Sequence, residues 1–268
     1  MTGREGPRDR GSPGIEVLPY EPRFERDTVD ICWETGLMGE SLAGTGRFED
    51  RRLFAMLFAL PWLRFEPEIC RIAVVDCAAV ATGRADGRRP RRRAVGYIIG
   101  TTDTRAEERW FEQCWTPRIA ARIAAWDWWR HPESARQVMR FSKARGSMRG
   151  AAGQAALAAA ASPGEAAAGS RAGAFEAGGP AFPAPLHINI HPGWQGRGLG
   201  SRLMASYLAA LRERGAPGVF LETSSRNSKA LPFYEKLGFR LVEAHEPQAG
   251  SEFWEGLPAT SLTYAMKL

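Results

Sequence analysis

Two spacings of hydrophobic residues along the chain predict strands alternating with helices. Short runs rich in Val, Ile and aromatic residues predict strands, at 15–20, 69–77, 94–100, 186–190, 218–222, 239–243 and 261–266. Apolar residues three and four apart predict helices, over 24–33, 48–60, 105–125, 199–214 and 228–237. Pro61 and Pro67 are expected to end the second of these helices. The pattern therefore predicts an α/β protein.

The helix predicted over 105–125 has an N-cap in Asp103 or Thr104 and is rich in tryptophan. One broad face carries the large apolar residues, namely Trp110, Phe111, Cys114, Trp115, Ile119 and Ile123, and three tryptophans follow at Trp126, Trp128 and Trp129. We interpret the tryptophans as core residues. A wall on the substrate side of an active site is the alternative.

Two stretches lack the residues needed for a core. Residues 1–14 consist of Gly, Pro and charged residues and are predicted to be disordered. In 143–184, Ala and Gly occupy 25 of 42 positions, which predicts a flexible insertion. The parts on either side of the insertion each lack a full set of sheet neighbours. We therefore expect one domain over 15–268.

The net charge of +6 is concentrated in one place. Residues 81–93 hold six arginines against Asp86, a net charge of +5. Such a run binds anions or serves as a nuclear import signal, here at 88–93. We interpret it as a solvated loop and do not expect nucleic acid, because no aromatic residues alternate with the arginines.

No secretory signal and no membrane-spanning run is seen, which predicts an intracellular, cytoplasmic protein, with nuclear import as an alternative. The four cysteines, Cys32, Cys70, Cys77 and Cys114, have no CxxC spacing and are expected to be free thiols. We predict neither a disulfide framework nor a metal site.

A glycine-rich turn follows the strand predicted over 186–190 and leads into the next helix. It reads Gln195-Gly196-Arg197-Gly198-Leu199-Gly200. A helix N-terminus carries unpaired N–H groups and partial positive charge, and glycines let phosphates approach the backbone. A Walker A loop is excluded because no lysine follows, and a GxGxxG fingerprint is excluded because position 201 is Ser201. The turn predicts a pyrophosphate cradle.

A second segment, about 30 residues further on, runs from Asn227 to Phe239 and contains Phe233-Tyr234 followed by Leu237-Gly238-Phe239. Together the two segments resemble the GNAT superfamily of N-acetyltransferases. Its acyl-CoA motif matches Gln195, Gly198 and Gly200. The clear resemblance covers 186–243 and implies a mixed, mostly antiparallel central sheet flanked by helices, with the insertion added.

A closer resemblance involves Gly96-Tyr97-Ile98-Ile99-Gly100-Thr101-Thr102-Asp103-Thr104, Trp115 and Leu186-His187-Ile188. These residues look like the acetyltransferase-like domain of eukaryotic O-GlcNAcases and its stand-alone microbial relatives. Members of that group need not all be active acetyltransferases.

The family resemblance implies acetyl-CoA as co-substrate, and a set of residues that bind it. The strand before the glycine turn separates from its neighbour, and pantetheine pairs with the backbone there, at Ile188, Asn189 and Ile190, opposite 218–222. The pyrophosphate would contact the backbone of Gln195, Gly196, Arg197, Gly198, Leu199, Gly200 and Ser201. Asn227 would contact the cofactor arm.

The resemblance also implies catalytic roles. Tyr234 lies where the family often has a general acid, which protonates the departing thiolate; a buried aromatic residue is the alternative. His187, which shares a strand face with Asn189, is a candidate base because of its pKa. Asp103 and Glu222 are rival candidates, and water is a further one. His191, before Pro192, is expected to shape the turn.

The sequence thus predicts an acyl-CoA-dependent N-acyltransferase, an enzyme that passes acetyl from acetyl-CoA to a small-molecule or protein amine by direct attack. A catalytically silent module with the acetyl-CoA-binding fold is the alternative. A protein that binds nucleic acid or chromatin through the arginine loop is a third hypothesis. We expect a monomer or homodimer and no membrane partner.

Overall fold

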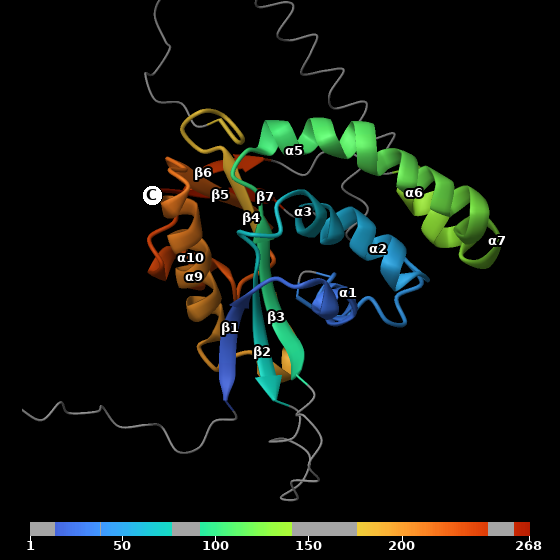
Figure 1. Cartoon of the computed structure of the whole chain (residues 1–268), viewed down its shortest axis with the longest axis horizontal. Helices are drawn as coiled ribbons and strands as arrows, with labels where there is room; N and C mark the ends of the chain where they lie inside the picture. The colour runs from blue at the N-terminus through green and yellow to red at the C-terminus, as the bar shows by residue number, and fades with distance from the viewer. Residues whose placement is uncertain (1–13, 38, 77–91, 141–175, 246–259) are drawn as a thin grey trace, which may run out of the picture.

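Seven strands form one sheet in the order β1-β2-β3-β4-β5-β7-β6 (Figure 1). The computed structural model describes residues 14–37, 39–76, 92–140, 176–245 and 260–268. The strands are β1 Ile15–Pro19, β2 Arg71–Asp76, β3 Arg92–Gly100, β4 Ala184–Ile190, β5 Gly218–Ser224, β6 Arg240–His245 and β7 Ser261–Lys267. Among these described strands, β4 and β5 are the only parallel neighbours. The mixed, mostly antiparallel sheet that we predicted is confirmed.

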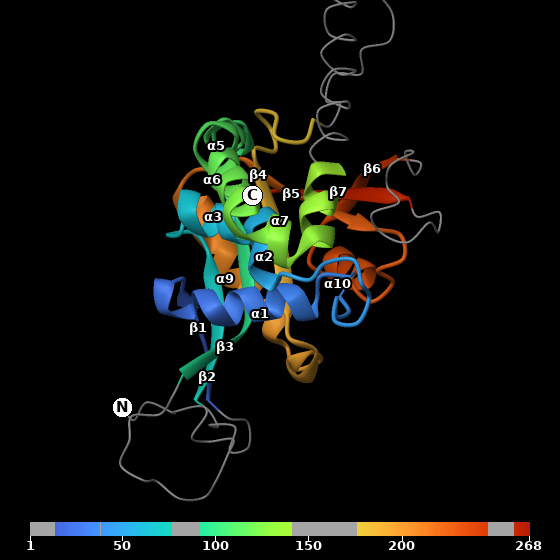
Figure 2. The same cartoon turned by 90° about the vertical axis from the view of Figure 1, so that its right-hand side faces the viewer.

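Helices cover both faces of this sheet. On one face lie α1 (Glu25–Glu34), α2 (Arg51–Phe58) and α3 (Leu60–Phe65), with α1 running across the strands (Figure 2). On the other lie α9 (Leu199–Glu213) and α10 (Leu231–Lys236) (Figure 1). All six residues that the apolar spacing assigned to the inner face of α9 are buried: Leu199, Leu203, Met204, Tyr207, Leu208 and Leu211. Short 3₁₀ turns lie at Pro22–Phe24 and Pro192–Trp194.

A long helical segment, residues 104–140, extends beyond the sheet and is called the arm (Figure 1). It contains α5 (Thr104–Trp110), a π turn at Phe111–Trp115, α6 (Thr116–Arg122), a second π turn at Ile123–Asp127, α7 (Trp128–Arg130) and a helix over 132–140. The predicted cap is confirmed, because the Asp103 carboxylate accepts a hydrogen bond of 3.0 Å from the backbone N–H of Ala106. The helix over 132–140 was not predicted.

The predicted core role of the arm's tryptophans is correct for Trp115, which is buried, and wrong for the last three. Trp126, Trp128 and Trp129 are 47%, 49% and 80% exposed. The prediction ended the helix at 125 and placed these three tryptophans after it. The arm instead continues as helix to residue 140, beyond the sheet, and carries them into solvent.

Three predicted boundaries also change. Pro61 does not end the helical region, because it occupies the first turn of α3, where a missing N–H costs no hydrogen bond. The helix expected from position 228 begins at Leu231. The predicted insertion 143–184 extends too far, because Ala184 opens β4 and Gly178 donates to Phe182 in an ordered turn before it.

Several sequence predictions fall on residues outside the described ranges. These are the N-terminal residues 1–13, nearly all of the arginine loop, Cys77 and residues 143–175 of the insertion. Of the other cysteines, Cys32 and Cys70 are buried, Cys114 is exposed, and all three are free thiols. In the described ranges, no helix combines the length and the hydropathy that crossing a bilayer requires.

Candidate functional site

The N-terminus of α9 faces open space. Gly198 is the N-cap residue of this helix, with φ +74°, and Gly196 has φ +73°. A Cβ atom at either glycine would meet no other atom within 4 Å. No side chain caps the helix, so the N–H groups of its first turn are directed outward together with the positive end of the helix dipole. This geometry suits a phosphate group.

Side chains of the turn hold it against β4. The Gln195 side-chain amide donates to the Ile190 carbonyl oxygen at 3.0 Å. His191 Nδ1 accepts a hydrogen bond of 3.2 Å from the backbone N–H of Gly193, which confirms the prediction that His191 shapes the turn. The Arg197 guanidinium lies 4.9 Å from the centre of the Trp194 ring, at cation–π distance.

Strands β4 and β5 separate beside this turn. They pair only at Ala184 with Val219 and at Pro185 with Phe220. Beyond these two pairs, β4 stays paired with β3 and β5 stays paired with β7. We call the gap between 186–190 of β4 and 221–224 of β5 the fork. It opens toward the glycine turn that follows β4.

A backbone position in the middle of β4 is left for a ligand in the fork. The His191 N–H bonds to the Val95 carbonyl of β3. Because bonding direction alternates along an antiparallel ladder, Leu186, Ile188 and Ile190 direct their backbone groups toward the fork, and Leu186 lies at its closed end. The Ile190 carbonyl already accepts from Gln195. The backbone N–H and C=O of Ile188 therefore stand at the fork without a partner strand.

His187 and Asn189 share a face of β4, as predicted, and this face is turned toward α1 and α3. The Asn189 side-chain amide donates to the Thr35 hydroxyl at 2.7 Å. The His187 ring packs on Trp62, with 4.5 Å between ring centres. Burial lowers the pKa of His187 to about 4. Its imidazole is therefore neutral at pH 7, and its nitrogen lone pair is available to accept a hydrogen bond.

The two candidate carboxylates differ in position. Because Pro185 pairs with Phe220, the period of two along β5 places Glu222 on the sheet face of His187. Glu222 is exposed, at the fork. Asp103 is occupied as the cap of α5, beyond the end of β3 where β4 and β5 are still paired.

Tyr234 is buried in α10, where its ring packs against Phe239 and Tyr264. Burial raises the pKa of Tyr234 to about 12, and no hydrogen-bond partner for its hydroxyl is found among the described residues. The phenol therefore keeps its proton at neutral pH. The start of α10 packs against the start of α9, since a Cβ at Gly200 would lie 3.0 Å from the Phe233 ring.

Asn227 occupies the turn that leads from β5 into α10. Its side-chain amide donates to the Thr223 hydroxyl at 3.3 Å, and its backbone carbonyl oxygen accepts from the backbone N–H of Ala230. The residue thus shapes the turn beside the fork. Its contact with a cofactor, which the family resemblance implies, stays a prediction.

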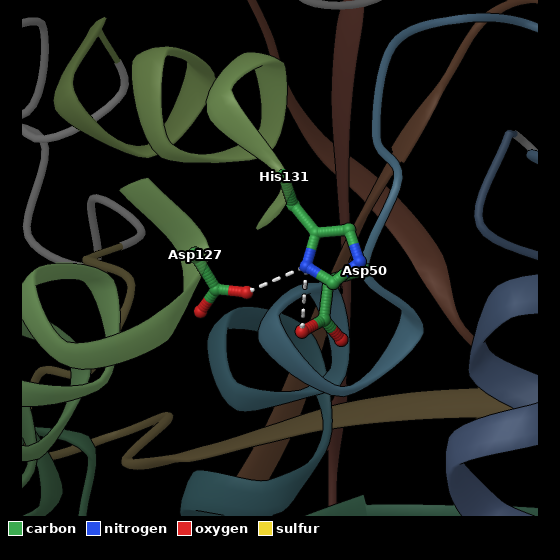
Figure 3. A group of neighbouring side chains, drawn as sticks. All are labelled: Asp50, Asp127 and His131. Atoms are coloured by element: carbon green, nitrogen blue, oxygen red, sulfur yellow. Dashed lines mark hydrogen bonds and ion pairs between the residues drawn. The ribbon is translucent and has the colours of Figure 1, made fainter. Parts of the chain in front are cut away.

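A second group of titratable residues, not predicted from the sequence, joins the arm to α2 (Figure 3). We call Asp50, Asp127, His131 and Arg122 the arm cluster. His131 Nδ1 lies 3.1 Å from an oxygen of Asp127 and 3.6 Å from one of Asp50. Arg122 contacts Asp50, and its Nε lies 3.0 Å from Asp127, an ion pair without hydrogen-bond geometry.

The arm cluster offers three metal-ligand atoms within 4.8 Å of one another, the one such group among the residues described. Arg122 already places a cation between the carboxylates. Burial and the neighbouring Asp50 raise the pKa of Asp127 to about 6, while that of Asp50 is lowered because hydrogen bonds from Asp127 and Arg122 outweigh burial. We interpret the cluster as a structural contact between the arm and α2, and we propose no metal there.

Comparisons with known proteins agree with this geometry. A mycothiol acetyltransferase of Thermobifida fusca (strain YX) is 42% identical over 57 residues, which are 21% of this chain and 18% of the relative. A glucosamine 6-phosphate N-acetyltransferase of Trypanosoma brucei brucei is 40% identical over 74 residues, 28% of this chain and 46% of the relative. The chain thus spans about a fifth to a half of the length of these relatives.

At the level of structure, the crystal structure of SsHAT superposes with a TM-score of 0.60 and 26% identity, over 95% of this chain and 98% of that one. The resemblance to O-GlcNAcase-associated domains is tested by none of these similarities and stays a prediction. The profile of the acetyltransferase (GNAT) family matches residues 104–239, just over half of the chain. The fork, the glycine turn and this match together show that the chain belongs to the acetyltransferase (GNAT) family.

Proposed function

We propose that this chain transfers an acetyl group from acetyl-CoA to an amine by direct attack. The observation that carries the proposal is the fork beside the uncapped N-terminus of α9. An acyl-CoA has an extended pantetheine arm attached to a pyrophosphate. The fork offers a strand edge to the arm, and the helix offers N–H groups to the pyrophosphate.

In this proposal, the backbone from Gln195 to Ser201 holds the pyrophosphate and Arg197 adds positive charge. Pantetheine pairs with the free backbone groups of Ile188. The side chain of Gln195 holds the turn, because its amide already bonds to Ile190. The glycine positions fit this role, since Gly196 and Gly198 leave open space where side chains would stand.

The chemistry requires a proton donor near sulfur and a neutral amine. Tyr234, which keeps its proton at neutral pH, donates to the sulfur as the C–S bond breaks. His187 stays neutral because its pKa is lowered, and it passes the proton of the amine on through water without remaining protonated. Glu222 lies on the same face of the fork and is the second candidate for this relay. Asp103 is the weakest candidate because it caps α5.

The acceptor is an amine on a small molecule or a protein. The name of the Trypanosoma relative, an N-acetyltransferase of glucosamine 6-phosphate, supports an amino acceptor. We further propose that residues 15–268 act as one domain, as a monomer or homodimer. The one sheet shared by both halves of the chain supports this.

The test combines titration calorimetry with acetyl-CoA and a free-thiol release assay over a panel of primary amines. We expect saturable binding and amine-dependent release of CoA. Absence of acetyl-CoA binding would refute the proposal. Binding without thiol release across sugars, amino acids, polyamines and peptides would favour the catalytically silent module instead.

A further inference from the structure

The fork begins at a defined residue, Pro185. Before it, β4 and β5 pair; after it, each strand stays paired with its other neighbour only. Two strands that run side by side normally continue to pair, because unpaired N–H and C=O groups are costly. Something at Pro185 must therefore direct β4 away from β5.

Tyr207 binds the backbone at that residue. It lies on the inner face of α9, is fully buried, and its hydroxyl donates to the Pro185 carbonyl oxygen at 2.9 Å. By the alternation along β4, the odd-numbered Pro185 directs its carbonyl toward β3 and not toward β5. The hydrogen bond from Tyr207 therefore fixes β4 beside β3 at the last residue that pairs with β5.

Gly100 of β3 makes room for this hydrogen bond. A Cβ atom at Gly100 would overlap both the Pro185 carbonyl oxygen and the Tyr207 hydroxyl. Any side chain here would push the two apart. Three residues from β3, β4 and α9 thus meet at the start of the fork, and we call Gly100, Pro185 and Tyr207 the fork lock.

The fork lock also connects the two halves of the proposed binding site. Tyr207 is on α9, whose N-terminus at Leu199 begins the phosphate cradle. Eight residues of α-helix separate them, about 12 Å along the axis. A rigid helix therefore sets the position of the fork relative to the cradle.

We propose that Tyr207 is a positioning residue for acyl-CoA: its hydroxyl holds β4 away from β5, so that the pantetheine arm can enter between them. This rests on the proposed function, although the position of β4 can be measured without a ligand. Tyr207 is buried and acts through the backbone of β4.

The test is Tyr207→Phe, which keeps the ring and removes the hydroxyl. We expect the Kd and KM for acetyl-CoA to rise about tenfold or more, the effect of losing one well-placed hydrogen bond and the geometry it fixes. At saturating acetyl-CoA, kcat should stay within about threefold of wild type, because the catalytic groups are intact. If Tyr207 only stabilised the fold, Tyr207→Phe would lower the melting temperature, and a rise in KM without a fall in kcat would not be observed.

Hydrogen exchange of the ligand-free protein is the second measurement. The Ile188 amide, which faces the fork, should exchange fast in wild type and become protected in Tyr207→Phe, because β4 can then pair with β5. Tyr20→Phe is the matched control, since Tyr20 is a buried tyrosine whose hydroxyl has no hydrogen-bond partner. It should alter neither readout.

The outcomes separate this proposal from the proposed function. Failure of the wild type to bind acetyl-CoA refutes the proposed function, whereas the exchange measurement still tests the lock. Unchanged Ile188 exchange in Tyr207→Phe overturns the lock. If the wild type binds acetyl-CoA, the lock is also overturned when Tyr207→Phe binds it with unchanged affinity. An equal loss of affinity in Tyr20→Phe has the same meaning.

Discussion

The fork and the arm cluster place polar groups in opposite ways. The arm cluster gathers two carboxylates, an imidazole and a guanidinium, and these groups pair with one another. The fork has few charged side chains, and its polar groups are backbone atoms left without a partner strand. A polar group that already has its hydrogen bonds and ion pairs stabilises the fold. A polar group without a partner can bind a ligand. The richest collection of titratable residues is therefore not where we place the chemistry.

The largest expected effect concerns Tyr234, the proposed general acid. Tyr234→Phe should lower kcat about 10²–10⁴-fold, the usual contribution of a positioned general acid, with acetyl-CoA affinity much less affected. Steady-state kinetics and calorimetry measure the two quantities. Tyr264→Phe is the control: it removes a neighbouring hydroxyl that bonds Glu235, and turnover should change only a few-fold. Equal turnover in the two variants would show that Tyr234 serves packing alone.

The next effect concerns the phosphate cradle. Gly198→Val should weaken acetyl-CoA binding about 100-fold, because a β-branched residue is strained at φ +74° and its side chain blocks the approach of phosphate. Gly215→Val is the matched control. Gly215 has φ +71° just past the other end of α9, also in open space. It should cost similar stability and leave Kd unchanged. If Gly198→Val bound acetyl-CoA with wild-type affinity, the assignment of the phosphate cradle would be wrong.

In the arm cluster, the expected effects fall on stability. Asp50 accepts hydrogen bonds from the N–H groups of Arg52 and Leu53 and pairs with Arg122. Asp50→Ala should therefore destabilise the protein by about 2 kcal/mol, mostly through the lost helix cap. Chemical denaturation measures this loss. Acetyl-CoA affinity should stay within about twofold of wild type. A fall in affinity as large as that of Gly198→Val would show that the arm cluster is coupled to the binding site.

The smallest effect is expected at Asp127, whose pKa is raised to about 6. Its ordinary pKa is about 3.9, so this group binds more protons in the folded state between these values, and its contribution to stability falls as pH rises from about 4 to 6. Asp127→Asn does not titrate. Its stability relative to wild type should therefore rise over this window and level off above pH 6. We expect a rise of about 1 kcal/mol, less than the full shift implies, because the lowered pKa of the paired Asp50 acts in the opposite sense. Thermal melts across pH measure the difference. A variant less stable than wild type at pH 7.5 would show that the ion pair with Arg122 dominates.

The sequence predicted those features of the fold that depend on one helix or one turn alone. The apolar spacing of α9 and the glycines of its turn act within one segment, and both predictions agree with the structure. The fork lock could not be predicted in this way. Gly100, Pro185 and Tyr207 are far apart in sequence and belong to no common motif, so their contact exists only after β3, β4 and α9 have packed.

The arm shows the opposite case, in which a local pattern misled. Large aromatic residues directly after a predicted helix favoured a core role, and this prediction failed at Trp126, Trp128 and Trp129, which are exposed. Asp50 and Asp127 likewise lie on distant segments, with no spacing that would associate them. Prediction from the sequence was accurate where hydrogen bonds are local and regular.

The two π turns of the arm have a consequence for how its sequence can change. An i→i+5 turn holds one residue more than an α-helical turn, so each is equivalent to a single inserted amino acid. Deleting one residue within Phe111–Trp115 would let that turn rewind as regular α-helix. Four α-helical residues turn the chain about as far as five π-helical ones, so Asp127 would stay beside Asp50 and the exposed tryptophans would keep their direction. In evolutionary terms, a π turn absorbs a one-residue insertion or deletion locally, and the surface that the rest of the arm presents is unchanged.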